Sequence, residues 1–183
     1  MEPLKEKPFT LYFGDEMRYG LISNFRRSWS KIGERTIVDK QQSFENRYLF
    51  SAVSPLSGDS FHLSGIDGFD SEAAHTFLLE LKKQHPDETV ILVWDNASCH
   101  RVKVHRTIPG LIVLFLPPYS PELNPTERFF EELRKATANR IFSTIDEQET
   151  VIEEALKALS NDTDAMKRLL GYEWILRQCS VVI

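Results

Sequence analysis

The sequence predicts an α/β domain in which helices cover the faces of a mixed β-sheet. Short apolar runs rich in β-branched residues recur along the chain, and such runs are typical of buried strands. Other segments carry apolar residues at the spacing of amphipathic helices. The elements alternate between strands and helices, an order that favours right-handed crossovers and parallel strands in the middle of the sheet.

The 183 residues make one domain of ordinary size with no internal boundary. Hydrophobic residues (42%) and charged residues (27%) are balanced as in globular proteins. A net charge of -5 argues against a surface that binds DNA everywhere, but it allows a basic patch beside an acidic site. Cys99 and Cys179 form no CxxC pattern, which indicates reduced thiols and no zinc site. With no signal peptide and no apolar run of about 20 residues, we expect a cytoplasmic protein without a membrane partner.

Strands and turns dominate the expected elements of the N-terminal third. The turn residues between the last two strands suit a hairpin, and the segment after the first strand is basic and contains Trp29. The expected elements are a strand at 9–13 that ends at Gly14-Asp15-Glu16, a loop or irregular hairpin at 18–35, a short strand at 36–39, and strands at 47–55 and 60–66 joined by 56–59.

Helices dominate the rest of the chain. Capping residues and the i, i+3, i+4, i+7 spacing of apolar side chains predict each of them. The expected elements are a helix from Asp70 or Ser71 to about Gln84 (apolar at Ala74, Phe77, Leu78 and Leu81), a strand at 90–94, a short helix or loop at 100–106, a strand at 111–116, a helix from Pro125 with Phe129, Phe130, Leu133, Ala136 and Ile141 near one face, and helices at 146–159 and 162–177.

Two of these strands deliver polar clusters at their carboxyl ends. Both runs, 90–94 and 111–116, are too short for helices, and we expect them to be buried on both faces. The first ends at Asp95-Asn96 and the second at a Pro-Pro pair. Asn124-Pro125-Thr126-Glu127 then has the form of a helix start, with Asn as the cap and Glu127 able to close a capping box.

Carboxylates at one edge of such a sheet could hold a divalent cation. If the strands ending at Asp15 and Asp95 are neighbours, their backbones lie roughly 5 Å apart, and the charges repel by about 3 kcal/mol at an effective dielectric of 20. Oxygen ligands without a Cys or His cluster point to Mg²⁺ or Mn²⁺. Glu127 could supply a third ligand, with Glu122 and Glu131 as rivals. Taken singly, Asp15 and Asp95 are explained equally well as turn residues and Glu127 as a capping residue.

DNASCH after one strand and LPPYSPELNPTERFFEELRK after the next resemble the catalytic core of DDE transposases. The match is to the bacterial insertion-sequence branch of the mariner-like superfamily, with Thr126 where isoleucine is usual. Upstream, FGDEMRYG and RRSW resemble the segment around the first catalytic aspartate of this family. The resemblance covers about residues 11–141.

The resemblance implies an RNase H-like fold with a five-stranded mixed sheet and helices on both faces. It implies that Asp15, Asp95 and Glu127 hold two Mg²⁺ ions, with Mn²⁺ as a substitute. The implied reaction is cleavage of DNA strands at transposon ends, followed by attack of the freed 3′-hydroxyl on target DNA. The implied partners are double-stranded DNA and a second copy of the chain in a homodimer.

Several further residues are candidates for contact with DNA or phosphate: His100, Asn96, Arg26, Arg27 and Trp29. A solvent-exposed loop histidine is an equally good explanation of His100, and a solvated charged hairpin explains the basic segment as well. Because the first strand starts near Phe9, we expect a catalytic core (about 9–142), a C-terminal helical extension (about 143–183), and no N-terminal helix-turn-helix DNA-binding modules.

Two other functions remain open from the sequence. One is a catalytically inactive transposase remnant that binds DNA or a partner. The other is an RNase H-like nuclease that recognises DNA structure and acts without transposition.

Overall fold

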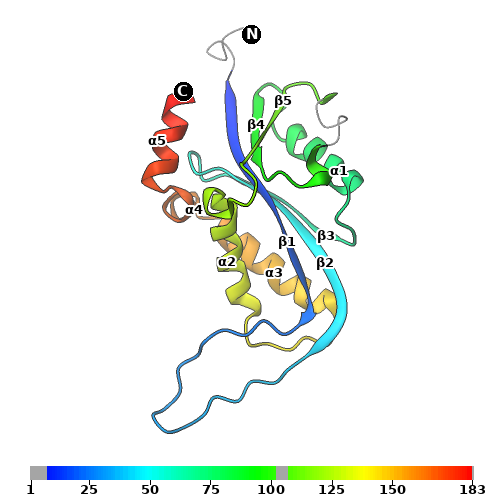
Figure 1. Cartoon of the computed structure of the whole chain (residues 1–183), viewed down its shortest axis with the longest axis vertical. Helices are drawn as coiled ribbons and strands as arrows, with labels where there is room; N and C mark the ends of the chain where they lie inside the picture. The colour runs from blue at the N-terminus through cyan, green and yellow to red at the C-terminus, as the bar shows by residue number, and fades with distance from the viewer. Residues whose placement is uncertain (1–7, 102–106, 183) are drawn as a thin grey trace.

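A five-stranded mixed sheet forms the centre of the computed structural model, which describes residues 8–101 and 107–182 (Figure 1). The spatial order of the strands is β3-β2-β1-β4-β5. Neighbours pair antiparallel from β1 to β3, whereas β4 and β5 run parallel to β1. The strands are β1 (Phe9–Ile22), β2 (Gln42–Val53), β3 (Ser60–Ile66), β4 (Thr89–Trp94) and β5 (Leu111–Phe115). The predicted mixed sheet and its β2–β3 hairpin are therefore confirmed.

Helices cover both faces of the sheet, as predicted. Helix α1 (Ser71–Lys83) buries its apolar stripe against one face, and α2 (Pro125–Thr137) and α3 (Ile145–Ser160) pack on the other. Because side chains alternate along each strand, the strands contribute apolar residues to a hydrophobic core on each face of the sheet. In β1, Tyr12 faces the α1 side, while Met17 and Tyr19 face α2 and α3. Two further helices, α4 (Thr163–Leu170) and α5 (Glu173–Val182), follow.

Strand β1 is longer than the sequence indicated. It continues through Gly14, Asp15 and Glu16 to Ile22, because β2 pairs with it along this whole length. Polar residues at alternate positions make this half-buried part of the strand difficult to predict from the sequence. The prediction that the strand ends at Asp15 is thus wrong, and Asp15 lies inside β1.

Strand β5 and the C-terminal helices also differ from the sequence prediction. Leu111 and Val113 of β5 pack with the α1 core, whereas Ile112 and Leu114 point to the opposite face and are 37% and 49% exposed, so the strand is not buried on both faces. The single helix expected at 162–177 is interrupted at Gly171, where a Cβ would lie 2.5 Å from the Lys167 carbonyl oxygen. Helix α2 ends at Thr137, so Ile141 is outside it and exposed.

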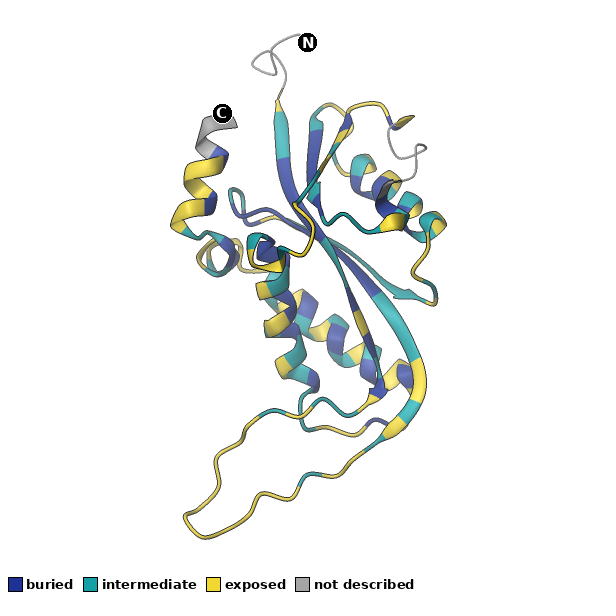
Figure 2. Ribbon diagram, viewed as in Figure 1, coloured by how far each residue is buried: buried dark blue, intermediate teal, exposed yellow. Residues whose placement is uncertain are grey.

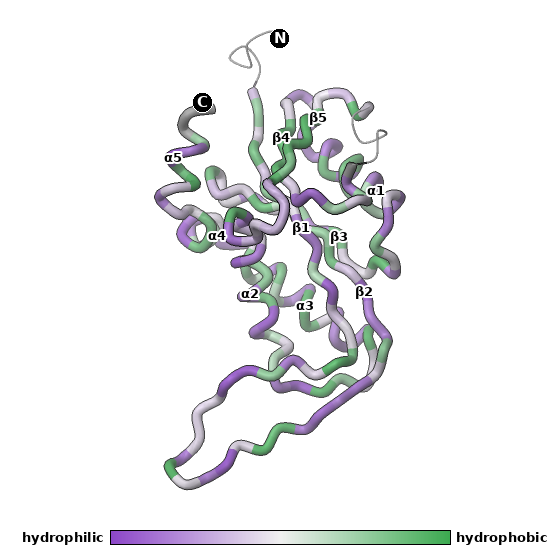
Figure 3. The backbone as a smooth tube through the Cα atoms, in the orientation of Figure 1, coloured by the Kyte–Doolittle hydropathy of each residue, from purple (hydrophilic) through white to green (hydrophobic). Residues whose placement is uncertain are grey.

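A long loop, residues 23–41, extends from the end of β1 to the start of β2 and projects from the rest of the chain (Figure 1). It forms neither helix nor strand, so the short strand expected at 36–39 is not found. Most of the loop is exposed (Figure 2), and hydrophobic residues are interspersed with hydrophilic ones along it (Figure 3). The prediction for residues 100–106 lies mostly outside the described residues. None of the described helices has the length and apolar character needed to cross a bilayer.

Candidate active site

The site forms where β4 ends and β1 continues. The parallel pairing of the two strands stops at Phe13 and Val93, so Asp15 and Glu16 lie just beyond the last paired residues. Side chains alternate along β1, which puts Asp15 on the face covered by α2 and Glu16 on the face covered by α1. Asp95 directly follows β4. This edge of the sheet therefore brings together acidic residues from two strands, as the sequence predicted.

The start of α2 is tied to β1 at the same place. The Asn124 side chain caps the helix by accepting from the Thr126 N–H (3.1 Å), and its Nδ2 donates to the Gly14 carbonyl (2.9 Å) and to Asp15 Oδ2 (3.1 Å). Thr126 Oγ1 donates to the Phe13 carbonyl (2.9 Å). These bonds bring the first turn of α2, which carries Glu127, next to Asp15.

Glu127 does not act as the capping-box residue that its position suggested. The Asn124 N–H, which such a residue would bind, donates to the Pro121 carbonyl at 3.0 Å. The Glu127 carboxylate is partly exposed and lies 3.8 Å from Arg134. Capping therefore does not explain the glutamate at this position.

One cavity of about 500 Å³ has Asp15, Asp95 and Glu127 in its wall. The rest of the described lining is Asn96, Ala97, the segment 116–121 and Asn124. The rival ligands Glu122 and Glu131 do not belong to it. Within the described chain, the group of three acidic or histidine ligands whose atoms lie within 4.8 Å of one another is Glu16, Asp95 and His100. Asp15, Asp95 and Glu127 line the cavity, but among the described residues they do not form such a close group.

Asp15 is electrostatically unfavourable as an anion. Its pKa is raised to about 8, first by burial and then by the neighbouring negative charges of Glu16, Glu127 and Asp95. A divalent cation in the cavity would remove this penalty, because it would neutralise the carboxylates that repel one another. The donor set, consisting of carboxylate oxygens, fits a hard cation such as Mg²⁺ or Mn²⁺.

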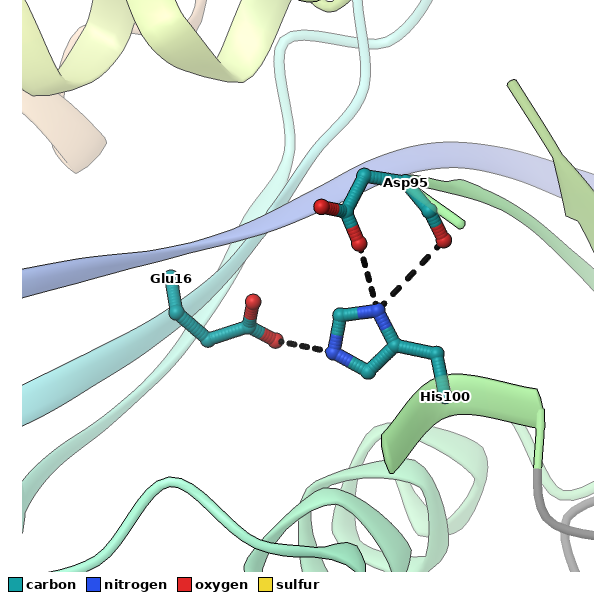
Figure 4. A group of neighbouring side chains, drawn as sticks. All are labelled: Glu16, Asp95 and His100. Carbon is teal, nitrogen blue, oxygen red and sulfur yellow. Dashed lines mark hydrogen bonds and ion pairs between the residues drawn. The ribbon is translucent and has the colours of Figure 1, made fainter. Parts of the chain in front are cut away.

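Asp95 has the opposite environment. The His100 Nδ1–H donates to its Oδ1 at 2.6 Å, and this bond holds the pKa of Asp95 below its usual range. On the other side of the imidazole ring, Nε2 lies 3.1 Å from Glu16 Oε1 (Figure 4). Burial alone would lower the pKa of His100, but the hydrogen bond to Asp95 and the ion pair with Glu16 outweigh it and raise the pKa to about 9. His100 therefore lies buried between the carboxyl groups of Asp95 and Glu16.

The residues predicted to contact DNA differ in how accessible they are in the structure. Asn96 lines the cavity, and Arg27 and Trp29 are exposed on the long loop. Arg26 is held at the base of that loop, where its Nη2 donates to the Glu131 carbonyl at 3.1 Å. His100 is only 1% exposed, which is incompatible with direct contact to a DNA phosphate. The exposed loop histidine considered from the sequence is excluded for the same reason.

Two further residues of the site, Asn124 and Glu16, are not predicted as site residues from the sequence. Asn124 was recognised as a helix cap, but nothing local to it indicated the bonds to β1. Glu16 lies on the opposite face of β1 from Asp15, so it does not belong to the predicted set of carboxylates. The only sequence signal for it was the histidine that follows Asp95 by five residues, which the fold brings to the same edge.

Residues 10–149 match the model of a protein family described as DDE superfamily endonuclease. The chain belongs to this family. A relative from Sinorhizobium fredii (strain NBRC 101917 / NGR234), the uncharacterized protein y4pE/y4sA, is 33% identical over 102 residues, which are 55% of this chain and 75% of the relative.

Solved structures of DNA-processing proteins share the fold. The Mos1 transposase paired-end complex with left transposon end superposes with a TM-score of 0.67 at 19% identity, over 88% of this chain and 51% of that one. The Mos1 mariner paired end complex with Mn superposes with a TM-score of 0.64 at 18% identity, over 88% of this chain and 53% of that one. For the simian T-cell lymphotropic virus intasome, the TM-score is 0.56 at 15% identity, over 82% of this chain and 48% of that one. This DDE-family chain thus has an RNase H-like fold and spans about half the length of these solved chains.

Replacing Asp15 by asparagine is expected to stabilise the metal-free protein. A carboxyl whose folded pKa is raised costs stability as pH rises from its unfolded value near 4 to its folded value near 8, and asparagine removes that cost. At pH 8 in EDTA we expect a gain of several kcal/mol in the free energy of unfolding, measured in urea, since each pKa unit corresponds to about 1.4 kcal/mol, and almost no gain at pH 4. An equal gain at both pH values would contradict the electrostatic explanation.

Proposed function

We propose that the chain is the catalytic module of a DNA transposase, which cleaves DNA strands and joins a 3′-hydroxyl end to target DNA. The observation that carries the proposal is the convergence of Asp15, Asp95 and Glu127 on one cavity in a chain of the DDE endonuclease family. These residues come from β1, the end of β4 and the first turn of α2, and they are far apart in sequence.

The cofactor is proposed to be a pair of Mg²⁺ ions, for which Mn²⁺ can substitute. Asp15, Asp95 and Glu127 would hold them, because all three line the same cavity. Bound there, the ions would supply electrostatic stabilisation of the attacking and leaving oxygens of a phosphodiester. Solved Mos1 complexes with Mn and with Mg support this choice.

The protein's own groups would position these ligands. Asn124 donates to Asp15 Oδ2 and leaves Oδ1 with the Glu16 backbone N–H, so both oxygens of Asp15 are oriented. The His100 bond keeps Asp95 ionised, because it lowers the pKa of this carboxylate. The carboxylates that line the cavity would act as cation ligands, and a direct displacement without a covalent protein–DNA intermediate fits this role best.

Strand transfer conserves the number of phosphodiester bonds. The 3′-hydroxyl oxygen forms a bond to a target phosphorus, the bond from that phosphorus to its own 3′-oxygen breaks, and the leaving oxygen takes up a proton. No external energy source is therefore required. The long loop with exposed Arg27 and Trp29 is proposed to contact the DNA backbone, and homodimerisation and separate helix-turn-helix segments belong to the same proposal.

A strand-transfer assay tests the proposal. A labelled duplex with a free 3′-hydroxyl is mixed with supercoiled plasmid and the protein in Mg²⁺ or Mn²⁺. We expect relaxed plasmid that carries the label covalently, and no such product in EDTA or with a 3′-deoxy end.

The same assay separates the alternatives. Cleavage of junctions or RNA–DNA hybrids without joining would indicate a structure-directed nuclease. Binding of DNA with neither cleavage nor joining, together with no heat of Mn²⁺ binding at millimolar concentration, would indicate an inactive remnant.

A further inference from the structure

Three side chains connect the interior of the protein to the cavity. Glu16 Oε1 faces Nε2 of His100 at 3.1 Å, and Nδ1 of the same ring lies 2.6 Å from Asp95 Oδ1 (Figure 4). The Glu16 side chain is 6% exposed, and that of His100 is fully buried. Asp95, by contrast, is half exposed and reaches the cavity. This chain of side chains therefore connects the interior on the α1 side of the sheet to one ligand of the proposed cations.

The ring at the centre of this chain is held rigidly. The indole of Trp94 stacks on His100 with ring centroids 3.7 Å apart and an interplanar angle of 17°, and Phe69 meets the imidazole edge-on at 5.8 Å. The short helix Ser98–Arg101 carries His100 back towards β4. With its plane fixed by aromatic rings, the imidazole directs its two nitrogens at fixed points.

Stability alone is a poor reason for burying Glu16. Moving a carboxylate out of water costs several kcal/mol, and a buried ion pair often does no better than an apolar pair of the same size. A glutamate here thus points to a role in the site.

The three residues could themselves be taken for a metal site, since their ligand atoms lie within 4.8 Å of one another. The distances argue against this. An ion between two ligand atoms holds each at about 2.0 Å or more, so the ligands would be about 3 Å or more apart. The 2.6 Å between Nδ1 and Asp95 Oδ1 is a hydrogen bond, and the two ring nitrogens point in opposite directions.

We propose that Glu16 is a positioning residue that acts through His100 to fix Asp95 Oδ1, so that the other oxygen of Asp95 is presented to a cation in the cavity. The inference rests on the proposed function, because it assumes that Asp95 is a cation ligand. Groups that orient a metal ligand in this way typically change metal affinity by 10- to 100-fold when they are lost.

Mn²⁺ affinity of the whole chain, measured by calorimetry, tests the proposal without reference to activity. Glu16→Leu removes the acceptor and is expected to weaken Mn²⁺ binding by roughly 10-fold or more. Glu16→Gln keeps an acceptor oxygen for Nε2 and is expected to stay within about threefold of the wild type. A matched control is Glu88→Leu, which removes another Glu–His pair (His85, 3.4 Å) at the far end of β4 and should leave Mn²⁺ affinity unchanged.

A double-mutant cycle tests whether Glu16 acts through His100. In a His100→Asn background, Glu16→Leu is expected to cause no further loss of Mn²⁺ affinity, because the connection to Asp95 is already broken. Additive losses of Mn²⁺ affinity in the double mutant would overturn the proposal. So would a Glu16→Leu protein that binds Mn²⁺ with wild-type affinity, or a Glu16→Gln protein whose Mn²⁺ affinity falls as far as that of Glu16→Leu.

The wild-type protein supplies an independent measurement if Glu16→Leu fails to fold. Titration with Mg²⁺, followed by the ring resonances of labelled histidines, is expected to shift His100 and leave His62 and His85 unchanged. A His100 ring resonance whose chemical shift does not change at saturating Mg²⁺ would overturn the proposal. Failure of the proposed function is distinguishable, because the wild type would then bind no Mn²⁺ and join no DNA ends.

Discussion

Replacing Asp95 by asparagine is expected to abolish metal-dependent strand cleavage and joining while leaving the fold intact. Asp95 follows the last residue of β4 and lies half exposed in the cavity wall, so an amide of the same shape can occupy its place. The amide carries no charge and is a weaker ligand for a hard cation. A loss of several kcal/mol of transition-state stabilisation corresponds to a rate reduction of roughly 1,000-fold or more.

The measurement is the initial rate of plasmid nicking and of strand transfer, with the circular dichroism spectrum as a check on folding. Asp87→Asn is the matched control, because Asp87 is exposed in the turn before β4 and does not line the cavity. We expect it to keep the wild-type rate. Substantial activity in Asp95→Asn would remove Asp95 from the mechanism.

Replacing Phe129 by alanine is expected to have the largest effect on stability. Phe129 is fully buried in the core between α2 and the sheet, stacks on His62 with ring centroids 5.0 Å apart, and also contacts Phe130. Removing a buried phenyl ring costs about 3–5 kcal/mol, which is a large share of the total stability of a domain. Because α2 carries Glu127, the change should also loosen the site, and cleavage should fall along with stability.

Urea unfolding measures this cost, and a lower midpoint at an unchanged slope is the expected result. Phe44→Ala is the control, since Phe44 is 76% exposed and its loss should change stability by no more than about 0.5 kcal/mol. A cost below about 1 kcal/mol for Phe129→Ala would contradict the packing described for α2.

Local chemistry made much of the fold predictable. The Asp70 cap and the apolar stripe of α1, the cap at Asn124 with Pro125 after it, and the turn between β2 and β3 all depend on neighbouring residues, and each appears in the structure. Asp95 lies at the carboxyl end of β4, as the rule for parallel strands predicts, but Asp15 reaches the same cavity from the interior of β1 and Glu127 reaches it from the first turn of α2.

The features that escaped prediction depend on contacts between distant segments. Polar residues from Asp15 to Arg18 resemble the end of a strand, yet pairing with β2 keeps β1 extended through them. The edge position of β5 cannot be recognised from its apolar composition. The Glu16–His100–Asp95 chain joins residues up to 84 positions apart, so only the folded arrangement of β1 and β4 reveals it.

Diffraction from crystals soaked in Mn²⁺, with anomalous scattering to locate the ions, tests the central proposal most directly. We predict manganese in the cavity, coordinated by carboxylate oxygens of Asp15, Asp95 and Glu127, and loss of these peaks in Asp15→Asn crystals. Manganese bound only elsewhere, for example at Glu16 and His100, or no ordered manganese at saturating concentration, would contradict a cation-dependent transposase site formed by these residues.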